Sequence, residues 1–104
     1  VDDEYLSRFR KPIYFCNVSR GEIVKLESLT NALEKGQVLG ACLDVLENEK
    51  LSQLTDEQQI TFSKLAQNPN VILTPHVAGW THQSYRRINE VLRDKIGRFL
   101  EINQ

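Results

Sequence analysis

The chain has 104 residues, which is enough for one domain of ordinary size. Its 13 basic and 14 acidic residues nearly cancel, and this argues against nucleic acid as the main partner, because phosphate binding needs a surplus of positive charge. No run approaches the roughly 18 apolar residues of a membrane span, and the charged first dozen residues lack the apolar core of a signal peptide. Two cysteines are too few for a disulfide scaffold or a zinc site, so we expect a cytoplasmic protein without a metal.

The first half of the chain predicts a helix, a strand, a helix and a second strand. Residues 4–10 predict a short helix or the end of one, and a near-continuous apolar run at 13–16 predicts a strand. Apolar residues at helical spacing then share one face between 26 and 33, and Gly36 stands where a helix C-cap glycine belongs. A second apolar run follows at 40–43.

The second half predicts a helix, a strand and a long helix. Residues 55–58 have the form of a capping box and open a helix, a third apolar run lies at 71–73, and apolar residues recur at steps of three and four from about Thr81 onward. The three apolar runs do not alternate with polar residues, and such runs are typical of strands buried on both faces of a sheet. We therefore interpret Cys16 and Cys42, which lie inside them, as small buried hydrophobes.

This alternation of strands and helices predicts an α/β fold. Right-handed crossovers between successive strands would give a parallel sheet with flanking helices. Three strands make a small sheet with two edges, and an edge exposes unpaired backbone groups. We therefore expect the chain to be part of a larger domain.

Polar residues that can carry chemistry follow each apolar run. Arg20 comes after the first run, Asp44, Glu47 and Glu49 come after the second, and His76 comes after the third. Each of these residues alone has a simpler interpretation. Arg20 could be a surface charge, Glu47 and Glu49 could be helix-start or solvated residues, and His76 could be an exposed histidine. Ligands of open α/β sheets bind at the carboxyl ends of the strands, so the convergence favours a cleft that contains a cation, an anion and a titratable group.

Three segments together resemble the D-isomer-specific 2-hydroxyacid dehydrogenases, which include phosphoglycerate, glycerate, formate and D-lactate dehydrogenases. The segments are Asn-Val-Ser-Arg-Gly at 17–21, Gly-Ala-Cys-Leu-Asp-Val at 40–45, and Asn-Val-Ile-Leu-Thr-Pro-His at 70–76. The resemblance runs from Asp3 to about Leu100. It implies a Rossmann-like parallel sheet, with residues 1–104 forming the second half of an NAD-binding domain.

The resemblance also implies a catalytic set of Arg20, Glu49 and His76 in an NAD-dependent oxidoreductase that interconverts a D-2-hydroxy acid and a 2-oxo acid. Arg20 would hold the substrate carboxylate and polarise the 2-oxo group, because a guanidinium donates two parallel hydrogen bonds and keeps its proton. His76 would be the general acid in reduction and the base in oxidation. Glu49 would pair with His76, orient its ring and favour the imidazolium.

Positions that contact the cofactor are implied in the same way. Asp44 resembles the family aspartate on the nicotinamide side, and Gly21 and Gly79 are expected to permit close backbone approach. The cofactor-contacting positions are Val18, Ser19, Arg20, Asp44, His76, Val77, Ala78 and Gly79. Trp80 stands where the family often has a small residue, and we interpret it as a packing residue at a helix start, with a substrate contact as the alternative.

The chain contains no G-x-G-x-x-G sequence. The pyrophosphate-binding turn and the substrate domain are therefore expected outside these residues, and the isolated chain is expected to be inactive. One alternative is a dinucleotide-sensing binding module on the same fold, similar to transcriptional corepressors. Another is an inactive fragment that pairs its exposed sheet edge with a second copy. For the full-length protein we expect a homodimer.

Overall fold

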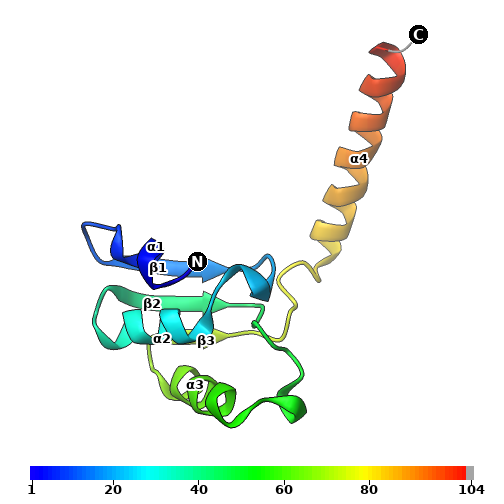
Figure 1. Cartoon of the computed structure of the whole chain (residues 1–104). Coiled ribbons are helices and arrows are strands. Elements are labelled where there is room, and N and C mark those ends of the chain that lie inside the picture. The colour runs from blue at the N-terminus through cyan, green and yellow to red at the C-terminus, as the bar shows by residue number, and fades with distance from the viewer. Residues whose placement is uncertain (103–104) are drawn as a thin grey trace.

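The computed structural model describes residues 1–102, which form a three-stranded parallel sheet with helices around it (Figure 1). The strands are β1 (Ile13–Asn17), β2 (Val38–Leu43) and β3 (Val71–Leu73), and they lie side by side in the order β1-β2-β3. The predicted α/β fold is confirmed, although β2 begins two residues earlier than the apolar run suggested. All three strands end on the same side of the molecule, where the polar loops follow them.

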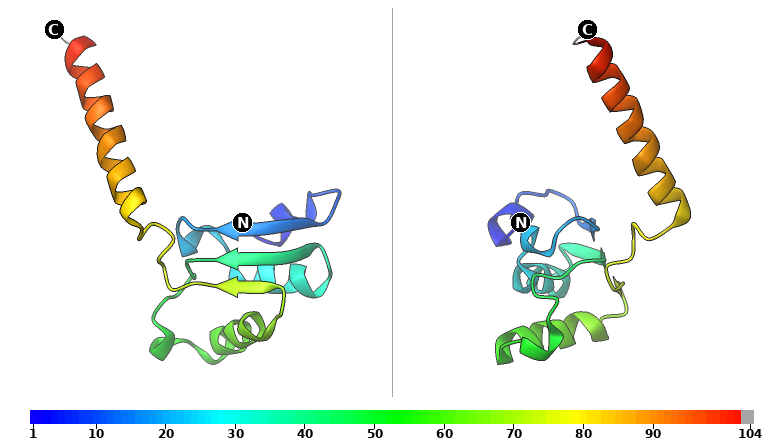
Figure 2. Two further views of the ribbon diagram at one scale, coloured as in Figure 1. Left: turned by 180° about the vertical axis from the view of Figure 1, so that it is seen from behind. Right: turned by 90° about the vertical axis from the view of Figure 1, so that its right-hand side faces the viewer.

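The helices are α1 (Asp3–Ser7), α2 (Leu26–Glu34), α3 (Asp56–Gln67) and α4 (His82–Ile102), with two short 3-10 turns, η1 (Gly21–Ile23) and η2 (Leu51–Gln53). Helices α1 and α2 lie on one face of the sheet, and α3 packs beside α2 along β3 (Figure 2). The core fills the space between these helices and the sheet. Its fully buried side chains are Leu6, Val24, Leu29, Val38, Leu43 and Leu65.

Helix α2 ends at the glycine that the sequence indicated. Gly36 adopts a φ of +73°, a left-handed conformation that costs glycine little. The Gly36 amide donates to the Leu33 carbonyl at 3.1 Å, and the Gln37 amide donates to the Ala32 carbonyl at 2.9 Å. This pair of hydrogen bonds is a Schellman motif, and it turns the chain directly into β2.

The predicted helix starts are confirmed at α3 and α4. The Thr55 hydroxyl accepts from the Gln58 amide at 3.2 Å, and the Gln58 side chain accepts from the Thr55 amide at 3.0 Å. These two reciprocal bonds make the capping box. At α4 the Thr81 hydroxyl accepts from the Ser84 amide at 3.0 Å.

The prediction that the strands are buried on both faces is wrong for the residues described. Tyr14, Cys16, Cys42 and Ile72 are exposed, and they alternate with residues that point toward α1 and α2. The remaining helix, α4, projects away from the sheet (Figures 1 and 2), so no layer within residues 1–102 covers this face. The interpretation of both cysteines as buried hydrophobes is wrong for the same reason.

Helix α4 is amphipathic and has no buried residue. Tyr85, Ile88, Leu92 and Ile96 form an apolar stripe along it, and each is more than half exposed. Within residues 1–102 no helix combines the length and the apolar character needed to cross a bilayer. The stripe is therefore an exposed apolar surface that no element within residues 1–102 covers.

Candidate active site

Asn17 ends β1 and fixes the loop that carries Arg20. Its side chain is only 6% exposed. The Asn17 amide group donates to the Arg20 carbonyl at 2.9 Å, and its oxygen accepts from the Ser19 amide at 3.1 Å. Asn17 had no predicted role of its own, although an asparagine at the start of a tight turn is a recognisable signal for such bonds.

Gly21 brings this loop into contact with the loop that follows β2. A Cβ at position 21 would overlap the carbonyl oxygen of Leu46, so only glycine fits here. The close backbone approach expected at Gly21 is therefore present, and it is made to the chain itself. A Cβ at Gly79 would meet no atom within 4 Å among the described residues.

Replacing Gly21 by alanine should destabilise the fold strongly, because the backbone of residues 46 and 47 must move to admit the methyl group. We expect a loss of about 3 kcal/mol in the free energy of unfolding, measured by urea denaturation followed by circular dichroism. The matched control is Gly97→Ala in α4, where no atom of residues 1–102 lies within 4 Å of the new Cβ. The control substitution should raise the free energy of unfolding by up to about 1 kcal/mol. Equal effects of the two substitutions would refute the packing role of Gly21.

Glu49 and His76 meet although they come from different loops. Nδ1 of His76 lies 3.4 Å from both carboxylate oxygens of Glu49, and the two side chains are about half exposed. His76 has a φ of +57°, which is uncommon for a residue other than glycine. Its amide donates to the Thr74 carbonyl at 3.0 Å across Pro75. A backbone held in this conformation is typical of functional sites.

Arg20, Glu49 and His76 line one hollow of about 440 Å³ at the carboxyl ends of the strands. Its other lining residues are Gly21, Glu22, Val45, Leu46, Glu47, Asn48 and Lys50. The three residues therefore lie together as the spacing indicated. A fixed cation beside a histidine–carboxylate pair can bind a small anion and transfer a proton to it.

Asp44 is buried beneath this rim and shapes the loop after β3. Its carboxylate accepts hydrogen bonds from the Thr74 hydroxyl at 2.6 Å and from the Val77 and Ala78 amides at 2.9 and 3.1 Å. The hydroxyl of Thr74, followed by these two amides and the charge of His76, holds the pKa of Asp44 below its ordinary value. Asp44 thus fixes the backbone of residues 77 and 78, two of the predicted cofactor contacts.

Asp44→Asn should lower the melting temperature at neutral pH, because the amide cannot accept all three bonds as an anion does. A depressed pKa means that the carboxylate stabilises the fold above its unfolded-state pKa of about 3.8, and that this contribution is lost as the pH falls through the folded-state value. Melting temperatures measured from pH 7 to pH 2 should therefore differ at neutral pH and converge below pH 3.8 for the two proteins. A constant difference across this range would contradict the role of the charge.

The remaining predicted residues lie around the same rim. Val18 is 58% exposed after β1, and Ala78 and Gly79 are exposed after β3.

Two further residues have simpler roles than the site residues. Glu47 acts at a helix start, one of its predicted interpretations, because its carboxylate accepts a hydrogen bond from the amide of Leu26, the first residue of α2, at 3.2 Å. Trp80 is 70% exposed, so its interpretation as a packing residue is wrong within residues 1–102. The same residues contain no group of three or more acidic, histidine or cysteine side chains that could hold a metal.

The fold is that of an open α/β domain, in which ligands bind at the carboxyl ends of the parallel strands. The polar loops of this chain lie at that edge of the sheet. The family model described as "D-isomer specific 2-hydroxyacid dehydrogenase, NAD binding domain" matches residues 1–78. The chain therefore belongs to the D-isomer-specific 2-hydroxyacid dehydrogenase family, as its three segments indicated.

Individual relatives agree with this assignment. The chain is 33% identical to D-3-phosphoglycerate dehydrogenase of Dictyostelium discoideum over 96% of its own length and 24% of that protein. Among solved structures, D-lactate dehydrogenase with NAD+ from Lactobacillus jensenii gives a TM-score of 0.69 at 36% identity and covers 92% of this chain and 31% of that one. D-Lactate dehydrogenase of Aquifex aeolicus, complexed with NAD and lactic acid, gives 0.70 at 29% identity and covers 96% and 32%. The chain thus spans between a quarter and a third of the length of these relatives.

Proposed function

We propose that this chain carries the catalytic residues of an NAD-dependent oxidoreductase that interconverts a D-2-hydroxy acid and a 2-oxo acid. The observation that carries the proposal is the single hollow that holds Arg20 and the Glu49–His76 pair. Family membership and relatives whose structures contain NAD support the same reaction class. The rest of the active site would come from the remainder of the full-length protein.

Arg20 binds the substrate in this proposal. Its guanidinium is exposed at the hollow and bonds only to the carbonyl of Ser19, at 2.9 Å, among the described residues. This neutral partner leaves most of the donors available for a carboxylate, which a guanidinium grips with two parallel hydrogen bonds. The same positive charge polarises the adjacent 2-oxo group.

His76 moves the proton. In reduction its imidazolium donates a proton to the carbonyl oxygen of the substrate, and in oxidation the neutral ring accepts the hydroxyl proton. Nδ1 of the ring contacts Glu49, so Nε2 is the nitrogen left to face the substrate. The Glu49 carboxylate, 3.4 Å from Nδ1, orients the ring.

The rim around the hollow fits a nicotinamide cofactor. Val18 exposes an apolar side chain after β1, and Gly79 leaves open space after β3, so a flat ring can approach both. Asp44 does not need to touch the cofactor to matter, because its three hydrogen bonds fix the loop at Val77 and Ala78. When bound, NADH supplies the hydride for reduction of the 2-oxo carbon.

The test is NADH oxidation by the full-length protein with pyruvate, glyoxylate and an aromatic 2-oxo acid, followed at 340 nm. We expect turnover of at least one acid and a product of the D configuration for the chiral products. NADH binding without turnover of any acid would favour the dinucleotide-sensing alternative. The 104-residue chain alone should bind NADH poorly, because it lacks a glycine-rich phosphate-binding turn.

We also propose that the full-length protein is a homodimer that interacts with neither nucleic acid nor membrane. The support for association is the apolar surface that residues 1–102 leave exposed, namely the stripe of α4 and the sheet face at Tyr14 and Ile72. Sedimentation equilibrium of the full-length protein should give twice the monomer mass. A monomer at micromolar concentration would contradict the proposal.

A further inference from the structure

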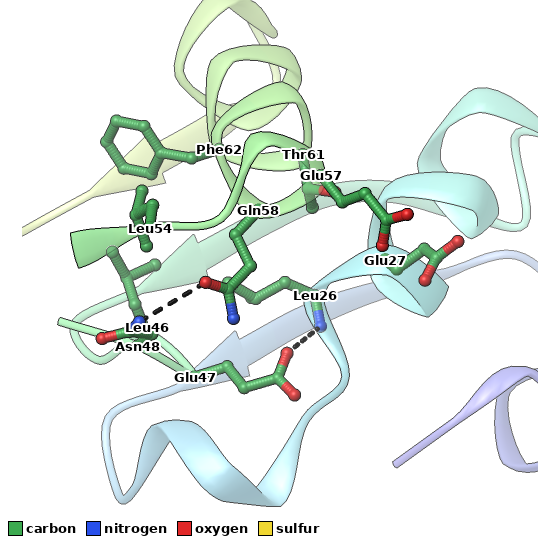
Figure 3. A pocket seen from close by; sticks show the side chains of 10 residues that line it. All are labelled: Leu26, Glu27, Leu46, Glu47, Asn48, Leu54, Glu57, Gln58, Thr61 and Phe62. Atoms are coloured by element: carbon green, nitrogen blue, oxygen red, sulfur yellow. Dashed lines mark hydrogen bonds between the residues drawn. The ribbon is translucent and has the colours of Figure 1, made fainter. Parts of the chain in front are cut away.

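A second pocket lies on the helical side of the molecule, between the start of α2, the start of α3 and the loop after β2 (Figure 3). It measures about 200 Å³, a size that suits a ligand of one small ring or a short chain. Its walls include four half-buried apolar side chains: Leu26, Leu46, Leu54 and Phe62. Their exposed carbon atoms would gain by contact with an apolar ligand.

The pocket carries a net negative charge. Three of its ten lining residues are glutamates, Glu27, Glu47 and Glu57, and none is a lysine, arginine or histidine. The carboxylate of Glu47 accepts a hydrogen bond from the Leu26 amide, whereas the carboxylates of Glu27 and Glu57 form no ion pair or hydrogen bond within residues 1–102. Figure 3 shows the side chains of Glu27 and Glu57 converging from α2 and α3.

Lys64, a cation of an adjoining hollow, is already paired. Glu27 and Glu57 also line an adjoining hollow that includes Lys64, and Lys64 forms an ion pair with Glu34 at 3.0 Å. Both free glutamates lie in the first turn of their helices, where the helix dipole favours an anion, so the fold tolerates them without a cationic partner. Their charge thus remains available to a ligand.

From this combination we propose that the pocket between α2 and α3 is a binding site for a small organic cation, an amine with a compact apolar body. The ammonium group would lie between Glu27 and Glu57, and the apolar body would lie against Leu26, which lies between these glutamates and the Leu54 end of the pocket (Figure 3). Such a ligand complements the charge and the apolar walls together, which neither a metal ion nor a neutral hydrocarbon does. The site is distinct from the hollow at Arg20 and does not depend on the proposed reaction.

The position of the site connects it to the candidate active site. Leu46, Glu47 and Asn48 line both the pocket and the hollow, and the next residue, Glu49, contacts His76. Asn48 also bonds across the pocket wall to Gln58 of α3, at 3.5 Å. A bound amine therefore contacts the segment that places the partner of His76.

The test is a titration of the ¹⁵N-labelled full-length protein with benzylamine, followed by amide chemical shifts in two-dimensional NMR. We expect a Kd of about 1 mM, as befits so small a ligand, with shifts at residues 26–27, 46–49 and 57–62. Benzyl alcohol, which lacks the charge, and benzoate, which reverses it, should each bind at least tenfold more weakly. Equal binding of benzyl alcohol, or shifts confined to α4, would overturn the proposal.

Variants distinguish binding by Glu27 and Glu57 from a general effect of the negative charge of the protein. Glu27→Gln and Glu57→Gln should each weaken benzylamine binding roughly two- to fivefold, and the double variant about tenfold. Glu101→Gln on α4 removes the same charge far from the pocket and should leave the Kd unchanged. Unchanged affinity of the double variant for benzylamine would contradict the proposed site. If the double variant fails to fold, the relative affinities of benzylamine, benzyl alcohol and benzoate for the unaltered protein decide whether the site binds a cation.

Discussion

Replacing His76 by alanine in the full-length protein should reduce the turnover of 2-oxo acid by roughly 10²–10⁴-fold, the usual effect of losing a general acid. The ring is half exposed and makes no packing contact in the core, so the protein should fold normally. The KM for the 2-oxo acid should change much less than kcat, because Arg20 still binds the carboxylate.

The measurement is steady-state NADH oxidation at saturating substrate. His82→Ala is the matched control, since His82 begins α4 and lies outside the hollow that His76 lines. A His76→Ala enzyme with undiminished kcat would show that another group transfers the proton.

Arg20→Lys should be nearly as damaging, with a loss of roughly 10²-fold or more in kcat/KM. The substitution keeps the positive charge, but an ammonium cannot make the two parallel hydrogen bonds that a guanidinium makes to a carboxylate. The Arg20 side chain bonds only to Ser19 among the described residues, and Asn17 holds the loop through the backbone of Arg20. The loop should therefore keep its conformation in the variant.

The control for Arg20→Lys is Arg86→Lys on α4, where the arginine only pairs with Glu90 on the protein surface. That variant should retain full activity. If Arg20→Lys also retained it, the carboxylate of the substrate would be bound elsewhere.

The architecture could be predicted because its signals are local. A capping box at Thr55 and Gln58, a C-cap glycine at Gly36 and three short apolar runs each specify their element from a few neighbouring residues. The convergence of Arg20 and His76 followed from topology alone, because parallel strands end on one side of a sheet.

The misjudged features depend on residues far away in the sequence. Apolar strands look the same whether one face or both are covered, and within residues 1–102 no element covers the face that carries Cys16 and Cys42. Trp80 is exposed for the same kind of reason, because no described element packs on it. The loop-shaping role of Asp44 was missed because its partners lie at least 30 residues away in the sequence. The partners of Asn17 lie only two and three residues away, so its role could have been found from the local sequence.

The central claim is that Glu49 and His76 form the proton-transferring pair of the active site. The most direct test is a double-mutant cycle on kcat for reduction of the 2-oxo acid, measured for the unaltered full-length enzyme, Glu49→Gln, His76→Ala and the double variant. Glu49 lies 3.4 Å from Nδ1 of His76 and acts through that ring. We therefore expect Glu49→Gln to lower kcat in the enzyme that keeps His76 and to have little further effect in the His76→Ala enzyme. Equal fold losses from Glu49→Gln in both backgrounds would show that Glu49 is not the partner of His76.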